Sequence, residues 1–137
     1  MAMFHLEIVT PTGTLYTGGV ERLQAPGSEG GFGVLARHHP MLASLQVGRI
    51  SFVEEGGEAR GAATSGGFVE VRRNRVTMLA ETAELSDQID VDRARTAHDR
   101  ALERLARWGD SEIDFARAEA ALARALNRLR VAGAEGD

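Results

Sequence analysis

The stretch IDVDRA, Ile89 to Ala94, marks the point at which the character of this 137-residue chain changes. Thirteen of the sixteen glycines and all three prolines lie in the first 85 residues, whereas alanine and arginine dominate the remainder. Because glycine and proline mark turns, we expect short, turn-separated elements before this stretch and long helices after it.

Before IDVDRA, the chain repeats short apolar segments at regular spacing. Phe4 to Val9 alternates apolar and polar residues with a period of two, as a half-buried strand does. Similar segments are GRISFV (48–53), GGFVEV (66–71) and RVTMLAE (75–81), and the turn signals between segments are PTGT (11–14), EEGGEAR (54–60) and RRN (72–74). This rhythm is typical of an antiparallel β-sandwich or barrel, which we predict for residues 1–85.

From Ser86 onward, the apolar residues recur with helical spacing. One stripe consists of Val91, Ala94, Ala101, Leu102, Leu105 and Trp108, and a second of Phe115, Ala118, Leu122, Ala125, Leu126 and Leu129. The link WGDSE (108–112) is so short that the two helices must run antiparallel, and Asp90 and either Asp110 or Ser111 can cap their first turns. We therefore predict an α+β fold, in which residues 86–137 form a helical hairpin.

The stripes of this hairpin consist largely of alanine, which buries little apolar surface. Each buried alanine contributes about 1 kcal/mol or less, against roughly 2 kcal/mol for a leucine. We therefore expect the hairpin to be marginally stable and to open easily.

Arginine, which supplies all sixteen positive charges of the chain, is concentrated on one flank of each helix. The flank comprises Arg93, Arg100, Arg104 and Arg107 in the first helix and Arg117, Arg124 and Arg128 in the second. Antiparallel pairing brings both flanks to one face, where we expect Arg93 level with Arg128 and Arg100 level with Arg124. Like charges one turn apart destabilise a helix slightly, so this face predicts an anionic ligand or an acidic partner.

The arginine pattern has a second interpretation, a solvated face balanced by Asp92, Asp99 and Glu103 on the other side of the first helix. The pattern also does not distinguish a nucleotide phosphate from a protein carboxylate. A net charge of -4 disfavours an arginine-rich hairpin that binds RNA, because phosphate contacts need a basic surface.

The composition and the short motifs give little support to other classes of protein. Without cysteine there is no disulfide or thiolate metal site, and without a long apolar run or signal peptide we expect a cytoplasmic protein that does not insert into the membrane. GFGVLA (31–36) matches the dinucleotide fingerprint, but Pro40 follows where a helix should continue, and GSEGGFG (27–33) lacks the lysine of a phosphate-binding loop. The four histidines have no metal-ligand spacing, and Ser65 lacks a catalytic frame, so we expect no metal site and no catalytic residues.

Over nearly its whole length, the chain resembles the epsilon subunit of bacterial F-type ATP synthases. The resemblance rests on MAMFHLEIVTPTG (1–13), GSEGGFGVLARHHPML (27–42), SGGFVEV (65–71), VTMLAETAE (76–84) and DFARAEAALARALNRLRVA (114–132). IDVDRA matches the family's nucleotide motif, [IL]-D-x-x-R-A. The order of these segments makes the match more specific than any one motif.

The resemblance implies a non-catalytic subunit of the rotating central stalk. In that family the sandwich binds the gamma subunit and the ring of c subunits, and helps to couple proton flow to ATP synthesis. The hairpin permits turnover when it is folded, and it restrains ATP hydrolysis when it extends alongside gamma toward the alpha and beta catalytic subunits. The implied location is the cytoplasmic face of the bacterial inner membrane, as a peripheral subunit.

The resemblance also implies a regulatory ATP site, because ATP holds the hairpin folded in members that bind it. The matching positions are Glu84, Ile89, Asp90, Arg93, Ala94, Arg100, Arg124 and Arg128. The arginines would meet the phosphates, Ala94 would leave space for the ligand, and Asp90 or Glu84 would accept hydrogen bonds. No cofactor is required.

Two points stay open at this stage. The nucleotide site could be vestigial, in which case the arginine face would dock only on acidic residues of the catalytic subunits. Gly31 stands where some members carry an acidic residue implicated in the c-ring contact, so His38 and its neighbouring loop are the remaining candidates for that contact.

Overall fold

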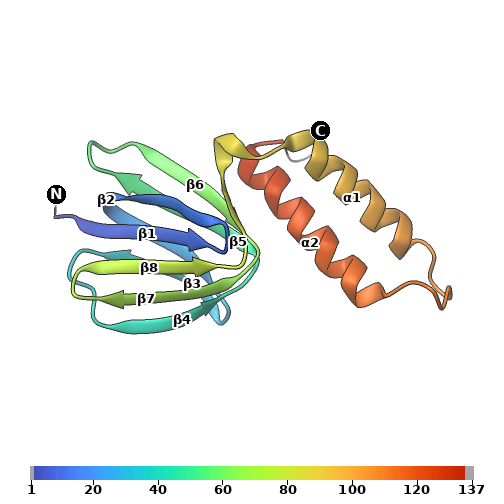
Figure 1. The fold of residues 1–137 in the computed structure, drawn as a ribbon, viewed down its shortest axis with the longest axis horizontal. Helices are drawn as coiled ribbons and strands as arrows, with labels where there is room; N and C mark the ends of the chain where they lie inside the picture. Colours follow the sequence, from blue (N-terminus) through green and yellow to red (C-terminus); the bar gives the residue numbers. More distant parts are fainter. Residues whose placement is uncertain (1, 135–137) are drawn as a thin grey trace. The chain divides into compact units, whose positions relative to one another are not determined.

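The computed structural model of the chain describes residues 2–134. The chain divides into two compact units, Met1–Ser86 and Asp87–Asp137. The first is built from strands and the second from two helices that lie side by side and are joined at one end (Figure 1). The α+β class, with a sandwich followed by a helical hairpin, is confirmed.

Nine strands form the first unit. They are β1 (Phe4–Thr10), β2 (Gly13–Gly27), β3 (Gly30–Leu35), β4 (Met41–Leu45), β5 (Gly48–Glu54), β6 (Ala59–Thr64), β7 (Gly67–Arg72), β8 (Arg75–Ala80) and β9 (Ala83–Leu85). Their order is β1-β8-β7-β4-β2-β5-β6-β9, β3 pairs with β2, and β1 also pairs with β2. The sandwich thus has one layer of β1, β8, β7 and β4 and a second of β3, β5, β6 and β9.

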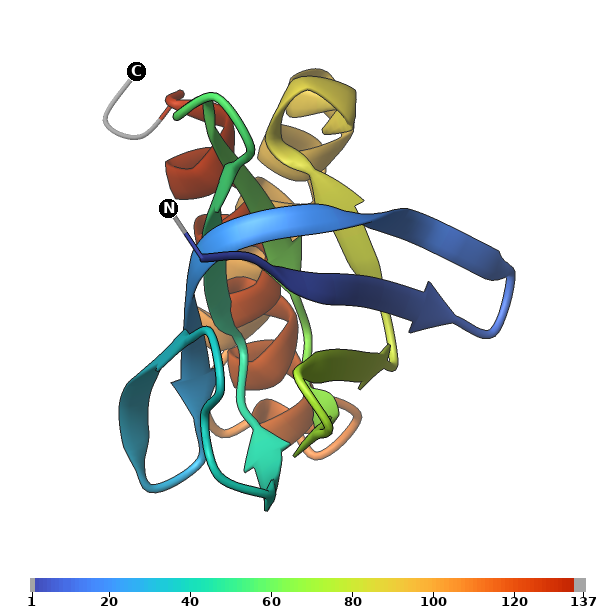
Figure 2. The ribbon, with the colours of Figure 1, turned by 90° about the vertical axis from the view of Figure 1, so that its left-hand side faces the viewer.

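The long strand β2 belongs to both layers. Its first half pairs with β1, from Gly13 to Val20, and its second half pairs with β3 and β5. The register with β5 shifts between Val20 and Arg22, because the extra residue Glu21 forms a bulge there. A bulge bends a strand, and Figure 2 shows β2 turning from one layer into the other.

One strand pair departs from the expected antiparallel pattern. β1 and β8 run parallel, with Leu6 opposite Val76 and Ile8 opposite Met78. Most of the sandwich separates these strands in the sequence, so no hairpin turn fixes their relative direction. Local turn signals predict the antiparallel neighbours and contain no information about this pair.

The core lies between the two layers of the sandwich. Its side chains alternate along the strands, as in β1, where Leu6 and Ile8 are fully buried. The other members of the core are Phe4, Val20, Leu23, Ala25, Val34, Leu45, Ile50, Phe52, Ala62, Val69, Val71, Val76, Met78 and Leu85. This alternation is the period of two that predicted the strands.

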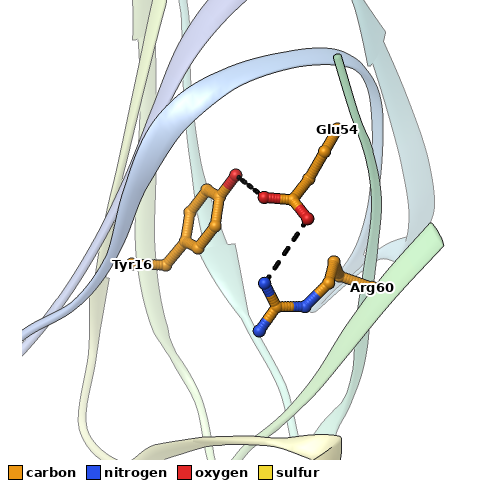
Figure 3. Close-up of polar contacts among 3 residues, drawn as sticks. All are labelled: Tyr16, Glu54 and Arg60. Atoms are coloured by element: carbon orange, nitrogen blue, oxygen red, sulfur yellow. Dashed lines mark hydrogen bonds and ion pairs between the residues drawn. The ribbon is translucent and has the colours of Figure 1, made fainter. Parts of the chain in front are cut away.

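A polar network ties β2 to the β5–β6 hairpin (Figure 3). The Tyr16 hydroxyl donates a 2.8 Å hydrogen bond to Glu54 Oε2, and Glu54 Oε1 lies 3.4 Å from the Arg60 guanidinium. The Tyr16 ring also packs against Phe52, with 4.6 Å between the ring centroids. Burial, and secondarily the hydrogen bond to the Glu54 carboxylate, raise the pKa of Tyr16 to about 12.

A short 3₁₀ helix, Ser86–Gln88, spans the boundary between the units, and the second unit continues with α1 (Val91–Leu105) and α2 (Phe115–Ala132). The predicted link and stripe are wrong in four details, one of which is that Leu102 is 46% exposed rather than part of a buried stripe. α1 ends at Leu105, so nine residues rather than five connect the helices, and Trp108 is 85% exposed instead of lying in the apolar stripe. The cap of α2 is Asp114, not Asp110 or Ser111. Gly109, at φ 90°, is a turn residue that ends the helical pattern early.

Candidate functional site

Asp90 is the N-cap of α1, as the sequence predicted. Its Oδ1 accepts a 3.0 Å hydrogen bond from the backbone N of Arg93, which satisfies one of the free donors of the first helical turn. Ile89 is 9% exposed, whereas the Asp90 and Arg93 side chains are exposed. In the motif IDVDRA, Ile89 is thus buried, whereas Asp90 and Arg93 remain accessible to a ligand.

Four alanines form a seam in the hairpin. Ala94 and Ala101 are the buried residues of α1, and they are seven positions apart. Ala118 and Ala125, equally spaced, are buried in α2 together with Leu129 and Val131. Seven residues are close to two helical turns, so each pair lies on one side of its helix. Small side chains at these positions let two helices approach closely.

The alanine seam fixes where the arginine flank lies. Arg93 and Arg100 each immediately precede a buried alanine of α1, and in α2 Arg117 and Arg124 precede buried alanines while Arg128 precedes Leu129. Each of these five arginines therefore lies beside the buried residue that follows it, and the direction around the helix axis is the same in all five cases. Because the helices are antiparallel, equivalent flanks lie on one face of the pair.

The equal spacing of the alanines permits a register in which both pairs of alanines face each other. Ala94 lies opposite Ala125 when Ala101 lies opposite Ala118. In this register Arg93 falls between Arg124 and Arg128, each about 3 Å away along the axis. In the same register Arg100 falls nearer to Arg117 than to Arg124, which differs from the level expected from the sequence.

Five guanidinium groups of the flank lack protein partners in the part of the chain that the structure describes. Within residues 2–134, the side chains of Arg93, Arg100, Arg104, Arg117 and Arg124 make no hydrogen bond or ion pair. Arg107 differs, because it lies beyond the end of α1 and pairs with Glu103. An arginine carries five donors and cannot lose its charge, so a row of unpaired guanidinium groups is suited to an anionic ligand or partner.

The acids proposed to balance the arginine face have other contacts. Asp99 lies 3.1 Å from His98 Nδ1, and Glu103 pairs with Arg107. Asp92 accepts from the Thr96 hydroxyl only through its backbone carbonyl. None of these carboxylates forms an ion pair with the five arginines of the flank in the part of the chain that the structure describes.

Glu84 is the one predicted site residue in the sandwich unit. It lies on β9, opposite Ala63 of β6, and its side chain is half-buried. The other seven residues belong to the hairpin unit. Arg104 and Arg117 complete the arginine flank but are absent from the set that the family resemblance implied.

The residues of the rejected motifs lie in strands and turns. Gly31 to Leu35 form most of β3, which pairs antiparallel with β2, and Ser28 and Glu29 form the turn between them. His38 Nδ1 contacts the carbonyl oxygen of His39 at 2.8 Å. Among residues 2–134, no group of three or more His, Asp or Glu side chains is placed to hold a metal ion.

The sandwich unit carries an exposed apolar row that sequence reasoning missed. Phe68 on β7 lies opposite Leu79 on β8, and these side chains are 58% and 55% exposed. Leu42 on β4 is 74% exposed. It lies two residues before Ser44, which pairs with Phe68. We call Leu42, Phe68 and Leu79 the apolar row. Exposed apolar side chains grouped in this way mark protein interaction sites.

A groove of about 530 Å³ adjoins the apolar row, since Leu42 contributes to both. It lies where β4 begins and β7 ends, and its lining consists of Pro40, Met41, Leu42, Glu70, Val71, Arg72 and Arg73. No helix in residues 2–134 is long and apolar enough to cross a membrane.

Both units match family models. Residues 3–86 match the β-sandwich domain of the ATP synthase delta/epsilon chain, and residues 87–133 match the long α-helix domain of the same chain. The chain belongs to the delta/epsilon chain family of ATP synthase. As a member of this family it is a non-catalytic subunit, as expected.

Close relatives of this family member carry the name ATP synthase epsilon chain. The chain is 48% identical over 133 residues to that of Halalkalibacterium halodurans, covering 97% of this chain and 99% of the relative. It is 50% identical over 129 residues to that of Nitratidesulfovibrio vulgaris, covering 94% of this chain and 95% of the relative.

Two solved structures have a similar fold. A chain in the cryo-EM structure of the Euglena gracilis mitochondrial ATP synthase, comprising OSCP, F1 and c-ring, has a TM-score of 0.76 and 24% identity, covering 90% of this chain and 77% of that one. A chain in the central stalk and c-ring structure of the Tetrahymena thermophila mitochondrial ATP synthase has a TM-score of 0.61 and 12% identity, covering 93% and 95%. At these identities the likeness supports the fold alone.

Proposed function

We propose that this chain is a central-stalk subunit of an F-type ATP synthase, whose sandwich docks on the gamma subunit and the c-ring and whose hairpin restrains ATP hydrolysis. Its location would be peripheral, at the cytoplasmic face of the bacterial inner membrane. The two similar solved chains come from assemblies that contain a c-ring, which supports this placement. ATP bound to the arginine flank would favour the folded hairpin and so relieve the restraint.

The observation that carries the nucleotide part of the proposal is the arginine flank beside IDVDRA, in which the Arg93 and Arg124 side chains make no hydrogen bond or ion pair within residues 2–134. Arg93 lies one residue before the buried Ala94, and we infer from the equal spacing of the buried alanines that it faces Arg124 and Arg128. Three guanidinium groups that converge from two helices can contact a polyphosphate only while the helices are paired. A ligand held in this way stabilises the folded hairpin by mass action.

The apolar row supports docking of the sandwich on a protein. Phe68 and Leu79 are large side chains on neighbouring strands, and burying them would supply the apolar centre that protein interfaces need. We assign the row to the gamma subunit. The adjoining groove, together with His38 in the loop just before it, is our candidate for the c-ring contact.

The docking proposal is tested by placing a charge in the apolar row. Phe68→Asp and Leu79→Asp should each lower the affinity for gamma at least tenfold, because a desolvated carboxylate would have no partner. Leu35→Asp is the matched control, since Leu35 is 63% exposed but lies on β3 in the other layer. Equal gamma binding by all three variants would show that the row is not the docking surface.

The inhibitory role is tested in the assembled enzyme by removing residues 86–137. ATP hydrolysis should rise under conditions in which the intact enzyme is inhibited, while gamma still co-purifies with the shortened chain. Unchanged hydrolysis by a fully assembled enzyme would contradict the role of the hairpin.

A second candidate function follows from the same arginine flank. Guanidinium groups bind carboxylates as well as phosphates, so the flank could dock only on acidic residues of the alpha and beta catalytic subunits, with a vestigial nucleotide site. In that case ATP would not bind the isolated chain, whereas neutralising the flank would still weaken inhibition.

A further inference from the structure

β3 is an edge strand of the sandwich, because among the described residues it pairs with β2 alone. Its sequence, GGFGVL, contains no charged residue and no proline, and its pairing with β2 has no register shift. Charges, prolines and bulges are the devices that normally blunt an edge strand, since an unpaired row of backbone groups pairs readily with another strand. β3 has none of the three, so its free edge is suited to receiving a strand from outside the chain.

The hydrogen bonds at the end of β2 show which residues of β3 face the free edge. At this end β2 has β3 on one side and β4 on the other. The backbone N of Gln46, just after β4, donates to the Pro26 carbonyl oxygen at 2.9 Å, so the backbone of Pro26 points away from β3. Gly31 pairs with Pro26, and its own N–H and C=O therefore lie on the free edge. Because this direction alternates along a strand, the backbone groups of Gly33 and Leu35 also lie there.

The two glycines at this edge are not required by the chain itself. Neither Gly31 nor Gly33 has a positive φ, and a Cβ on either would meet no atom closer than 3.6 Å. Glycine weakens the interior of a strand, and it often marks a site that another backbone approaches closely. Both residues are exposed, so these glycines leave the edge bare toward a second molecule.

The spacing of residues along this edge makes it complementary to itself. When two copies of β3 pair antiparallel about a two-fold axis at Gly33, each residue faces the one equally far from Gly33 in the other copy. Leu35, which is 63% exposed, then lies opposite Gly31 of the second copy, where a side chain is missing. Glu29 lies opposite Arg37 of the second copy, and both side chains are exposed and without a hydrogen bond or ion pair within residues 2–134. Backbone pairing, apolar contact and charge thus favour the same register.

We propose that the edge of β3 is a homodimer interface, at which β3 of one copy pairs antiparallel with β3 of a second copy, centred on Gly33. Gly31, Gly33 and Leu35 exchange backbone hydrogen bonds with their counterparts, and Leu35 covers Gly31 on both sides. Such a contact closes after two copies and does not propagate into a filament. It uses neither the arginine flank nor the apolar row, so its failure and that of the proposed function are distinguishable.

Sedimentation velocity of the full-length chain, at micromolar to millimolar concentrations, tests this interface. One short strand from each copy makes a small interface, so dimers should form toward the upper end of this range. Gly33→Pro should weaken dimerisation about tenfold or more, because proline cannot donate the central hydrogen bond. Pairing with β2 does not use the N–H of Gly33, so the variant should still fold, which its melting curve checks.

A charge reversal tests the register without altering the strand. Glu29→Arg and Arg37→Glu should each weaken dimerisation several-fold, because each places like charges opposite one another twice in the dimer. The double variant should restore the dissociation constant of the parent. These exposed side chains decide the result if Gly33→Pro does not fold.

A parent that stays monomeric at millimolar concentration, or a folded Gly33→Pro that dimerises like the parent, would overturn the interface. A double reversal that dimerises no better than the single reversals would refute the register centred on Gly33. Loss of the dimer in Phe68→Asp but not in Gly33→Pro would assign self-association to the apolar row, and would also overturn the inference.

Discussion

Asp90 Oδ1 accepts a 3.0 Å hydrogen bond from the backbone N of Arg93, so two residues of the nucleotide motif are joined before any ligand binds. The Asp90 carboxylate therefore has a structural role as the cap of α1. Its second oxygen is available to a ligand without breaking this contact.

Replacing Asp90 separates these two roles. Asp90→Ala should destabilise the hairpin by about 1 kcal/mol, whereas Asp90→Asn should retain the cap. Thermal unfolding of the helical signal, without nucleotide, measures the difference. If both variants melt like the parent, the capping contact does not stabilise the hairpin.

The alanine seam should resist larger side chains. Ala125 is fully buried, so Ala125→Leu should overpack the contact between the helices and cost about 1–3 kcal/mol. A smaller folded population should also lower the apparent affinity for ATP. Ala123→Leu is the matched control, because Ala123 is exposed on the same helix. Equal melting temperatures for the two variants would contradict the seam.

The Tyr16–Glu54 contact predicts a loss of sandwich stability in alkali. The pKa of Tyr16 rises from 10.0 to about 12 on folding, so the folded state favours the neutral phenol. This stabilisation is fully present below pH 10 and is lost as the pH rises through 12. The chain has no lysine and a single tyrosine, so few other groups titrate in this window.

Urea unfolding between pH 9 and pH 12 measures this effect, and Tyr16→Phe is the control because it cannot ionise. The free energy of unfolding should fall more steeply with pH in the parent than in Tyr16→Phe. Parallel pH profiles would show that the partly buried phenol does not contribute.

Local periodicity was sufficient to predict most of the fold. Phe4 to Val9 and Arg75 to Ala80 alternate because one face of each strand is buried, and that alternation is visible in the sequence. The parallel pairing of these two strands was not predictable, because it depends on contacts between distant segments. The end of α1 was also missed, because the apolar spacing continues to Trp108 although the helix stops at Leu105.

The site was predictable in part. The spacing of Arg93 and Arg100 reveals the flank, and Asp90 was identifiable as a cap. The register between the helices depends on how their side chains pack against each other, and the spacing within each helix does not determine it. The apolar row was missed because Phe68 and Val69 are adjacent apolar residues, and the sequence does not tell which of the two faces the core.

Calorimetric titration of the full-length chain with ATP tests the central claim most directly. The parent should bind ATP, and Arg93→Ala and Arg128→Ala should each bind ten- to a hundredfold more weakly, because an arginine–phosphate contact is typically worth roughly 1.5–3 kcal/mol. Arg95→Ala, on the opposite flank of α1, should bind like the parent. Equal affinities in the parent and all three variants, or a parent that does not bind millimolar ATP, would contradict a nucleotide site on the arginine flank.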